Sequence, residues 1–241
     1  MHGMEREIVI ARRFNGPPGS ANGGYLAGLM ASTIDGAAQV MLRRPPPLEQ
    51  PLRLTFDEAG QGALRDGEQL IATVEPTELT MEVPQAPTLE EAEASTQQFS
   101  DVNEHVFPHC FVCGPARAEE DGLRIFAGPV AGRELVATLW TPSDSLGDKN
   151  GVMKPEFVWA ALDCPGANAL TLAERDGTTP VVLGTFRAQA FVSIPTGRPY
   201  VIAGWPLERE GRKHYAGTAI FDIDGTLLAQ AHAVWIEVGT Q

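Results

Sequence analysis

The feature that most constrains this chain is an architectural pattern that occurs twice. In each half, a segment of mainly small and apolar residues with helix signals precedes several short segments that read as strands. The two helical segments span residues 20–34 and 155–164. Because the first is apolar on nearly every face, it is predicted to be a buried helix of about three turns. The halves repeat this order of elements but not their letters.

Each predicted helix has its own start signal. Asn22 stands where an N-cap residue would stand, directly before two glycines. The second helix begins at Pro155, a residue that is well suited to a first helical turn. Pro165, one residue beyond the segment, must end or kink this helix because it lacks an N–H group.

Proline and glycine divide the rest of the chain into short pieces. Strand-like segments are predicted at residues 5–14, 51–57, 68–75, 79–83, 123–126, 134–140, 180–190, 200–208, 213–222 and 227–238. An acidic, alanine-rich stretch lies between them, in which Thr88 and Glu91 resemble a capping box. We interpret this stretch as a linker with a short exposed helix. It places an N-terminal unit with its linker at 1–100 and a C-terminal unit at 101–241.

Charge and composition restrict the classes of partner. The chain has 18 basic and 31 acidic residues, a net charge of −13, and no basic block, which argues against a nucleic-acid partner. No apolar run approaches the ~18 residues that would span a membrane, and the start of the chain lacks a signal-peptide pattern. The 3 cysteines, an odd and sparse count, fit a reducing compartment. We expect a cytoplasmic protein without a membrane partner.

Four motifs occur in a characteristic order: Asn22-Gly-Gly-Tyr-Leu-Ala-Gly-Leu, Cys110-Phe-Val-Cys-Gly-Pro, Trp159-Ala-Ala-Leu-Asp163, and Asp222-Ile-Asp-Gly-Thr-Leu. Together they resemble the hotdog-fold acyl-CoA thioesterase superfamily. The resemblance implies an α+β double hotdog fold: two fused units, each with an antiparallel sheet wrapped around a central helix.

The resemblance also implies where a site would form. In that superfamily, a Gly-Gly helix start from one unit faces an Asp on the helix of the other. Here the first helix has the glycines but Ala31 in the Asp position. The second helix has Asp163 but begins with Lys154 and Pro155. If the halves pack as a pseudo-dimer, one composite site is complete and the other is dead.

Hydrolysis of a thioester needs fixed donors for the developing oxyanion and a carboxylate that activates water or attacks directly. The unpaired amides of a helix start can supply the donors. The resemblance therefore assigns the Gly24 amide, alone or with that of Tyr25, to the carbonyl. Asn22 would orient the substrate or water, and Asp163 would act as base or nucleophile. Further candidates for substrate binding are Gly23, Tyr25, Glu156 and Trp159.

Each of these residues also has a purely structural interpretation. Asn22 would only cap the helix, and Glu156 would only favour the helix dipole. Trp159 would be a core residue. Asp163 would pair with Arg187 or Lys154. An Asp163 that faces Gly24 across the interface of the halves, within the reach of one substrate carbonyl, favours the catalytic interpretation. A basic partner deep in the core would favour a binding or structural one.

Four residues invite a zinc site: His109, Cys110 and Cys113, with His105 nearby. No second ligand pair with finger-like spacing follows. We therefore predict no metal and no cofactor, and we expect the two cysteines to be small buried residues.

The sequence as a whole predicts a hydrolase of acyl-CoA or acyl-carrier thioesters. The alternative is a non-catalytic protein that binds acyl groups or CoA thioesters, and a structural role in an assembly is a third interpretation. The expected ligand is a small acyl thioester. Because antiparallel sheet edges often pair, we also expect a homodimer of two-unit chains.

Overall fold

The structure is a computed structural model, and it describes residues 4–99, 105–173 and 180–239. The N-terminal strands are β1 (Glu5–Val9), β2 (Ala38–Leu42), β3 (Pro51–Phe56), β4 (Gly62–Asp66) and β5 (Gln69–Pro76). The C-terminal strands are β6 (Gly128–Pro129), β7 (Val136–Trp140), β8 (Val181–Ala190), β9 (Tyr200–Glu210), β10 (Lys213–Phe221) and β11 (Leu227–Glu237). The α-helices are α1 (Gly23–Ala31), α2 (Leu89–Thr96), α3 (Pro155–Ala161) and α4 (Cys164–Leu170). No helix in these ranges is long and apolar enough to cross a membrane.

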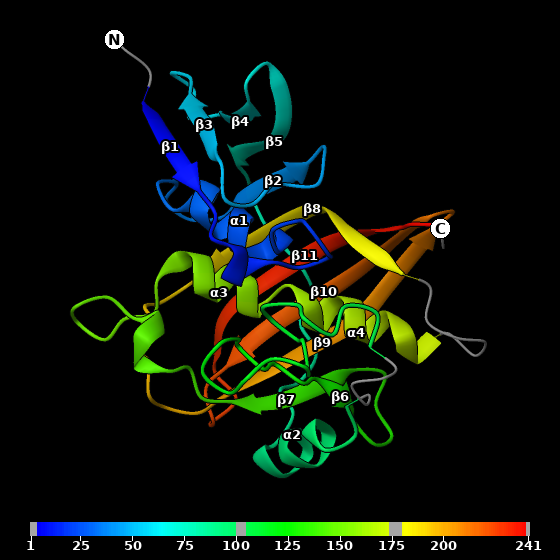
Figure 1. The fold of residues 1–241 in the computed structure, drawn as a ribbon. Coiled ribbons are helices and arrows are strands. Elements are labelled where there is room, and N and C mark those ends of the chain that lie inside the picture. The colour runs from blue at the N-terminus through cyan, green and yellow to red at the C-terminus, as the bar shows by residue number, and fades with distance from the viewer. Residues whose placement is uncertain (1–3, 100–104, 174–179, 240–241) are drawn as a thin grey trace.

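All of these strands form one antiparallel sheet, in the order β1-β3-β4-β5-β2-β8-β11-β10-β9-β7-β6 (Figure 1). The halves join where β2 pairs with β8, with Ala38 opposite Ala188 and Val40 opposite Phe186. Outward from this joint, β5, β4, β3 and β1 follow on one side, and β11, β10, β9 and β7 follow on the other. The same strand order thus occurs twice. The predicted α+β fold, with an internal duplication of architecture, is confirmed.

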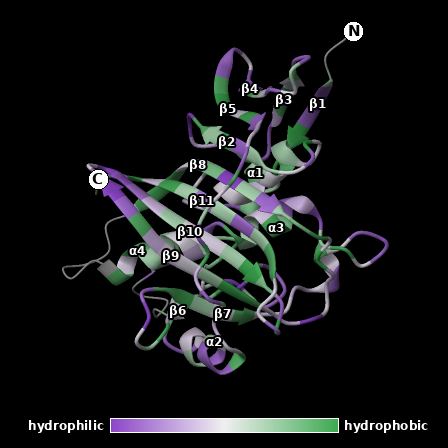
Figure 2. Ribbon diagram, turned by 180° about the vertical axis from the view of Figure 1, so that it is seen from behind, coloured by the Kyte–Doolittle hydropathy of each residue, from purple (hydrophilic) through white to green (hydrophobic). Residues whose placement is uncertain are grey.

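The central helices lie against one face of this sheet (Figure 1). Helix α1 packs on α3 and on strands of the first half, while α4 covers β9 and β10. Leu26, Ala27 and Met30 of α1 have no exposed surface, as its apolar sequence predicts. Figure 2 shows the other face of the sheet, where hydrophilic and hydrophobic positions alternate along the long C-terminal strands.

Two glycines one helical turn apart allow α1 to approach α3 closely. A Cβ atom on Gly28 would lie 2.5 Å from the Cα of Glu156, and one on Gly24 would lie 2.5 Å from the Cβ of Asp163. Real Cβ atoms do not approach other atoms this closely, so a larger residue at either position would push the helices apart. The pair therefore sets the distance between the two halves.

Helix α2 has the predicted capping box. The hydroxyl of Thr88 accepts a hydrogen bond from the Glu91 amide at 3.1 Å, and the Glu91 carboxylate accepts one from the Thr88 amide at 2.8 Å. The sequence predicted a short exposed helix. The structure instead buries one face of the helix against β7, through Ala92 and Ser95. The predicted unit boundary near residue 100 lies outside the described residues.

Two predicted strands are absent because other contacts hold these segments. Residues 79–83 form no ladder; the carbonyl of Leu79 accepts a hydrogen bond from Gln230 at 3.2 Å instead. Residues 123–126 bond to the loop at Phe111 and Val112, and Arg124 has a positive φ of 54°, which interrupts an extended run. The short strands β2 and β4 were not predicted. The first strand is shorter than predicted, since a 3-10 turn follows at Arg12–Phe14.

Candidate active site

A break in the second central helix positions Asp163. Pro165 cannot donate the hydrogen bond that a continuous helix would require, and the Gly166 amide bonds to the Asp163 carbonyl at 3.1 Å. The carbonyl of Leu162, which Gly166 would otherwise contact, accepts a bond from the Thr218 hydroxyl at 2.8 Å. The chain therefore ends α3 and starts α4 at this point, as the proline predicts. The bend places Asp163 at the joint between the two helices.

The carboxylate of Asp163 meets the start of α1 from the other half. Its Oδ2 accepts hydrogen bonds from the side-chain amide of Asn22 at 2.7 Å and from the backbone amide of Gly24 at 3.0 Å. The side-chain carbonyl of Asn22 caps the helix by accepting a bond from the Tyr25 amide at 2.8 Å. Asn22 is thus both a helix cap and a donor to Asp163. Asp163 therefore faces Gly24 across the two halves, but in direct hydrogen-bond contact rather than with a substrate carbonyl between them.

Among the residues that the structure describes, no basic group pairs with Asp163. Burial raises the pKa of Asp163 to about 7, and the hydrogen bonds from Gly24 and Asn22 oppose this rise only in part. Arg187 instead donates to Gln39 at 2.5 Å, and Lys154 is exposed at the start of α3. A carboxyl group with a pKa near neutrality can both accept and release a proton under physiological conditions.

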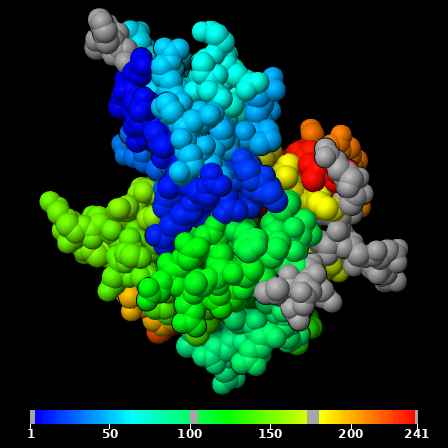
Figure 3. Space-filling view, viewed as in Figure 1, coloured from blue at the N-terminus to red at the C-terminus, as the bar shows by residue number. Residues whose placement is uncertain are grey.

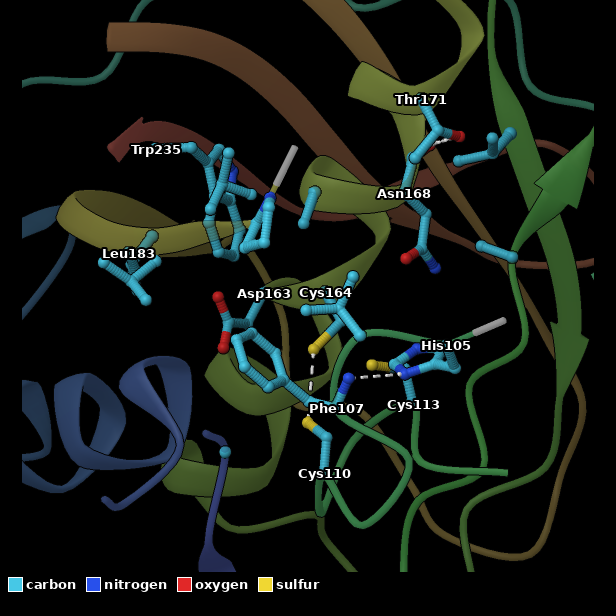
Figure 4. Close-up of a pocket in the computed structure, with 18 of the residues that line it drawn as sticks. His105, Phe107, Cys110, Cys113, Asp163, Cys164, Asn168, Thr171, Leu183 and Trp235 are labelled. Carbon is cyan, nitrogen blue, oxygen red and sulfur yellow. Dashed lines mark hydrogen bonds between the residues drawn. The ribbon is translucent and has the colours of Figure 1, made fainter. Parts of the chain in front are cut away.

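Asp163 faces a cavity of about 160 Å³ (Figure 4). Residues of both halves and of the intervening loop line this cavity, among them Asn22, Gly23, Phe107, Cys110, Cys113, Asp163, Cys164, Asn168, Leu183 and Trp235. Figure 3 shows how closely the N-terminal half, in blue and cyan, sits on the green segments below it. The amide of Phe111 in that loop donates to the Asn15 carbonyl at 2.7 Å, so the loop is fixed to the first half.

Three residues that line the cavity each have a buried side-chain atom without a hydrogen-bond partner among the described residues: Oδ1 of Asp163, Nδ2 of Asn168 and Nε1 of Trp235. Buried polar groups are nearly always paired, so these three atoms can bond to water or to a polar ligand. The nitrogen atoms of Asn168 and Trp235 are hydrogen-bond donors. Oδ1 of Asp163 accepts a hydrogen bond when the carboxyl group is ionised and can donate one when it is protonated.

The start of α1 adds a further donor. The amides of Gly24 and Tyr25 are occupied by Asp163 and Asn22, whereas the amide of Gly23 has no partner among the described residues. Gly23 also lines the cavity. The sequence assigned the carbonyl-binding role to Gly24, but in this structure the Asp163 carboxylate occupies that amide. Gly23 is therefore the better-placed donor.

The structure places three predicted binding residues away from the cavity. Tyr25 stacks on Phe14 with ring centroids 4.1 Å apart, within an aromatic cluster. Trp159 is buried and packs edge-to-face on Phe186 at 5.6 Å. Glu156 lies beside Gly28 on the first turn of α3. Because α3 presents this face to α1 and the sheet, these side chains support the joint between the halves.

Sequence reasoning missed several residues that line the cavity. Asn168 lies five residues beyond Asp163, and its polar side chain in the otherwise apolar helix α4 was the available signal. Trp235 reads as an ordinary strand residue in the sequence. Cys164 lies next to Cys110 in the structure. The sequence could not predict this contact, because the two residues are about fifty positions apart. All three cysteines are buried, as was expected for Cys110 and Cys113.

No protein-family model matches the sequence, and no curated protein does. Solved structures do match. A protein of unknown function with a hot dog fold from Alicyclobacillus acidocaldarius is 11% identical, with a TM-score of 0.59 over 100% of this chain and 96% of that one. Acyl-CoA thioesterase II TesB2 from Mycobacterium marinum is 12% identical, with a TM-score of 0.61 over 98% of this chain and 94% of that one. The dehydratase domain of a mycocerosic acid synthase-like polyketide synthase is 14% identical, with a TM-score of 0.66 over 98% of this chain and 91% of that one.

Proposed function

We propose, from the premise that this chain has the double hotdog fold, that it hydrolyses acyl thioesters at one composite site between its halves. The observation that carries the proposal is the buried Asp163 carboxylate, which is hydrogen-bonded to the start of α1 through Oδ2, has no described partner for Oδ1, and belongs to a residue that lines the cavity. The likeness to an acyl-CoA thioesterase supports the same reaction class.

The reaction would begin with the thioester carbonyl at the start of α1. The free amide of Gly23 and the positive end of the helix dipole would stabilise the oxyanion that forms when the carbonyl is attacked. The unpaired N–H groups of Asn168 and Trp235 would hold other polar atoms of the substrate. Glycine at position 23 lets Leu183 pack against the start of α1, since a Cβ atom there would lie 2.8 Å from the Leu183 side chain.

Asp163 would then act as general base. Its free Oδ1 accepts a proton from a water molecule while the water oxygen bonds to the carbonyl carbon. Collapse of the tetrahedral intermediate breaks the C–S bond, and the proton passes from Asp163 to the departing thiolate. The products are a carboxylic acid and a thiol. With a pKa of about 7, the carboxyl group can take part in both proton transfers near neutral pH.

Two features restrict the type of reaction and the size of the substrate. Elimination of water needs both an acid and a base, but Asn22, the side chain that faces Asp163, cannot exchange a proton. The pair therefore supports attack on a carbonyl better than elimination of water. The cavity of about 160 Å³ is comparable to cavities that hold a benzene-sized group. We therefore infer that a short or aromatic acyl group is the substrate.

The second candidate is a protein that binds acyl thioesters without cleaving them. The observation that favours it is the Gly24 amide, which Asp163 already occupies and which is therefore withheld from a carbonyl. In this case Asp163 would only hold the two halves together, and the cavity would be a binding pocket.

Release of free thiol from short, long and aromatic acyl-CoA thioesters tests the proposal. We expect turnover of short or aromatic substrates and a loss of about 100-fold or more in kcat for Asp163→Asn. Asp35→Asn, an exposed Asp changed in the same way, is the matched control and should retain full activity. Equal turnover by Asp163→Asn would refute the role of Asp163. No turnover, combined with a ligand-dependent rise in Tm, would establish the binding protein instead.

A further inference from the structure

All three cysteines of the chain meet at one point beside the cavity. Their sulfur atoms lie within 4.8 Å of one another, and the Sγ atoms of Cys110 and Cys164 are 3.7 Å apart. Cys110 and Cys113 come from the loop before β6, whereas Cys164 is the first residue of α4 (Figure 4). All three are buried free thiols that line the cavity. A chain with only 3 cysteines in 241 residues has no need to bring them together for packing alone.

The loop that carries Cys110 and Cys113 is a tight turn beside the start of α1. The amide of Gly114 donates to the Cys110 carbonyl at 2.9 Å, and the side-chain amide of Asn22 donates to the Cys110 sulfur at 3.9 Å. A Cβ atom on Gly114 would lie 2.5 Å from that carbonyl oxygen and 2.6 Å from the Cys110 nitrogen, so the turn requires glycine. A tight Cys-x-x-Cys turn that holds its two sulfur atoms close together can supply two ligands of one metal ion.

The position of the third sulfur is set by the helix break. Cys164 directly follows Asp163, and the bend that turns Asp163 toward α1 also brings the Cys164 sulfur to Cys110. In a tetrahedral site with Zn–S bonds of about 2.3 Å, neighbouring sulfur atoms are about 3.8 Å apart. The observed 3.7 Å between Cys110 and Cys164 matches this separation.

We propose that Cys110, Cys113 and Cys164 bind one Zn²⁺ ion through three thiolates, with a fourth coordination position open to the cavity. Soft thiolate ligands select zinc over harder divalent ions. The proposal revises the expectation of no metal, which looked for a second ligand pair with finger-like spacing and did not include Cys164 as a single third ligand. It rests on the sulfur geometry and is independent of the proposed hydrolysis.

The fourth position is not filled by a residue of the described chain. No fourth His, Cys, Asp or Glu ligand atom in the described ranges lies within the same 4.8 Å span. His105 lines the cavity, but its Nδ1 accepts a hydrogen bond from the Phe107 amide at 3.1 Å, which leaves the other ring nitrogen protonated in the neutral form. Three protein ligands with one open position are typical of catalytic rather than structural zinc sites. A water molecule or a substrate atom would occupy this position.

Zinc binding would ionise the three thiols and release their protons to solvent. A disulfide between Cys110 and Cys164 is the rival outcome, and it would leave Cys113 as an odd thiol.

The test uses the full chain, freed of any metal-binding tag and reduced under anaerobic conditions. Titration with Co²⁺, a spectroscopic substitute for Zn²⁺, should give a thiolate-to-cobalt charge-transfer band that saturates at one equivalent and disappears when Zn²⁺ is added. Zinc should also protect all three thiols from alkylation, as counted by mass spectrometry of the intact chain.

Cys113→Ser and Cys164→Ser should each weaken metal binding by at least about tenfold. His105→Ala, which changes a potential ligand at the same cavity, should leave the affinity and the spectrum unchanged. Circular dichroism checks that each variant is folded, and the wild-type titration and alkylation count stand even if a variant is not. Absence of the charge-transfer band in the reduced wild type would overturn the proposal. So would equal metal affinity in a folded cysteine variant, or a stable Cys110–Cys164 disulfide in protein purified under reducing conditions.

Discussion

Replacing Asp163 by asparagine should make the protein more stable, and by an amount that depends on pH. Asn has nearly the same shape, and its carbonyl can accept the hydrogen bonds from Asn22 and Gly24 that Oδ2 accepts now. What the substitution removes is a buried charge without a cationic partner. Removal of such a charge is stabilising wherever the wild-type carboxyl group is ionised.

The magnitude follows from the pKa of Asp163, which burial raises from 3.8 to about 7. A raised carboxyl pKa means that the folded state binds the proton more tightly than the unfolded state does. The protonated Asp163 side chain therefore contributes its full stabilisation below a pH of 3.8, the pKa of the group in the unfolded chain. This contribution to the free energy of unfolding is lost as the pH rises from there through the folded pKa of about 7. With about 1.4 kcal/mol for each pKa unit, the full loss is about 4 kcal/mol.

Urea unfolding of wild type and Asp163→Asn across this pH range measures the effect. Both proteins are treated with a chelator, so that bound metal does not contribute. The difference in free energy of unfolding between variant and wild type should widen by about 3 kcal/mol from about pH 5 to about pH 8, in favour of the variant. The exposed Asp35→Asn control should follow the wild type at every pH. A difference for Asp163→Asn that stays constant with pH would refute the assignment of an uncompensated buried carboxylate.

Three other substitutions probe the surroundings of the site. Gly28→Ala should lower the free energy of unfolding by about 1–3 kcal/mol, because its Cβ would meet the Glu156 backbone, while Gly239→Ala, which meets nothing, should be neutral in the same urea experiment. Asn22→Ala removes a helix cap worth about 1 kcal/mol and a donor to ionised Asp163, so the pH midpoint of thioester hydrolysis should rise. Trp235→Phe deletes an unpaired buried donor, so the KM should rise without loss of Tm; an unchanged KM would remove Trp235 from the substrate site.

Local chemistry made much of this site predictable from the sequence. The Asn22 cap, the capping box at Thr88 and Glu91, and the break near Pro165 depend on residues within one helical turn of each other. Such signals are short-range and appear directly in the sequence. Together with the family resemblance, they were sufficient to bring Asp163 and Asn22 into one site.

The structure differs from the expectations where distant segments decide the outcome. Tyr25 and Trp159 were expected to bind substrate, yet neither lines the cavity, since the sequence does not reveal which face of a fully apolar helix meets a cavity. Residues 123–126 have strand-like letters, yet they pair with a loop because that loop is anchored to the first half. The cysteine cluster depends on the crossing of α4 with that same loop, which no local pattern records.

The central claim is that both halves contribute to one site at Asp163. A crystal structure of Asp163→Asn with a short-chain acyl-CoA bound would test it most directly. The account predicts the acyl group in the cavity, with the thioester carbonyl oxygen within hydrogen-bond distance of the Gly23 amide and its carbon facing residue 163. An acyl group bound elsewhere, with residue 163 still held by Gly24 and remote from the thioester, would contradict it.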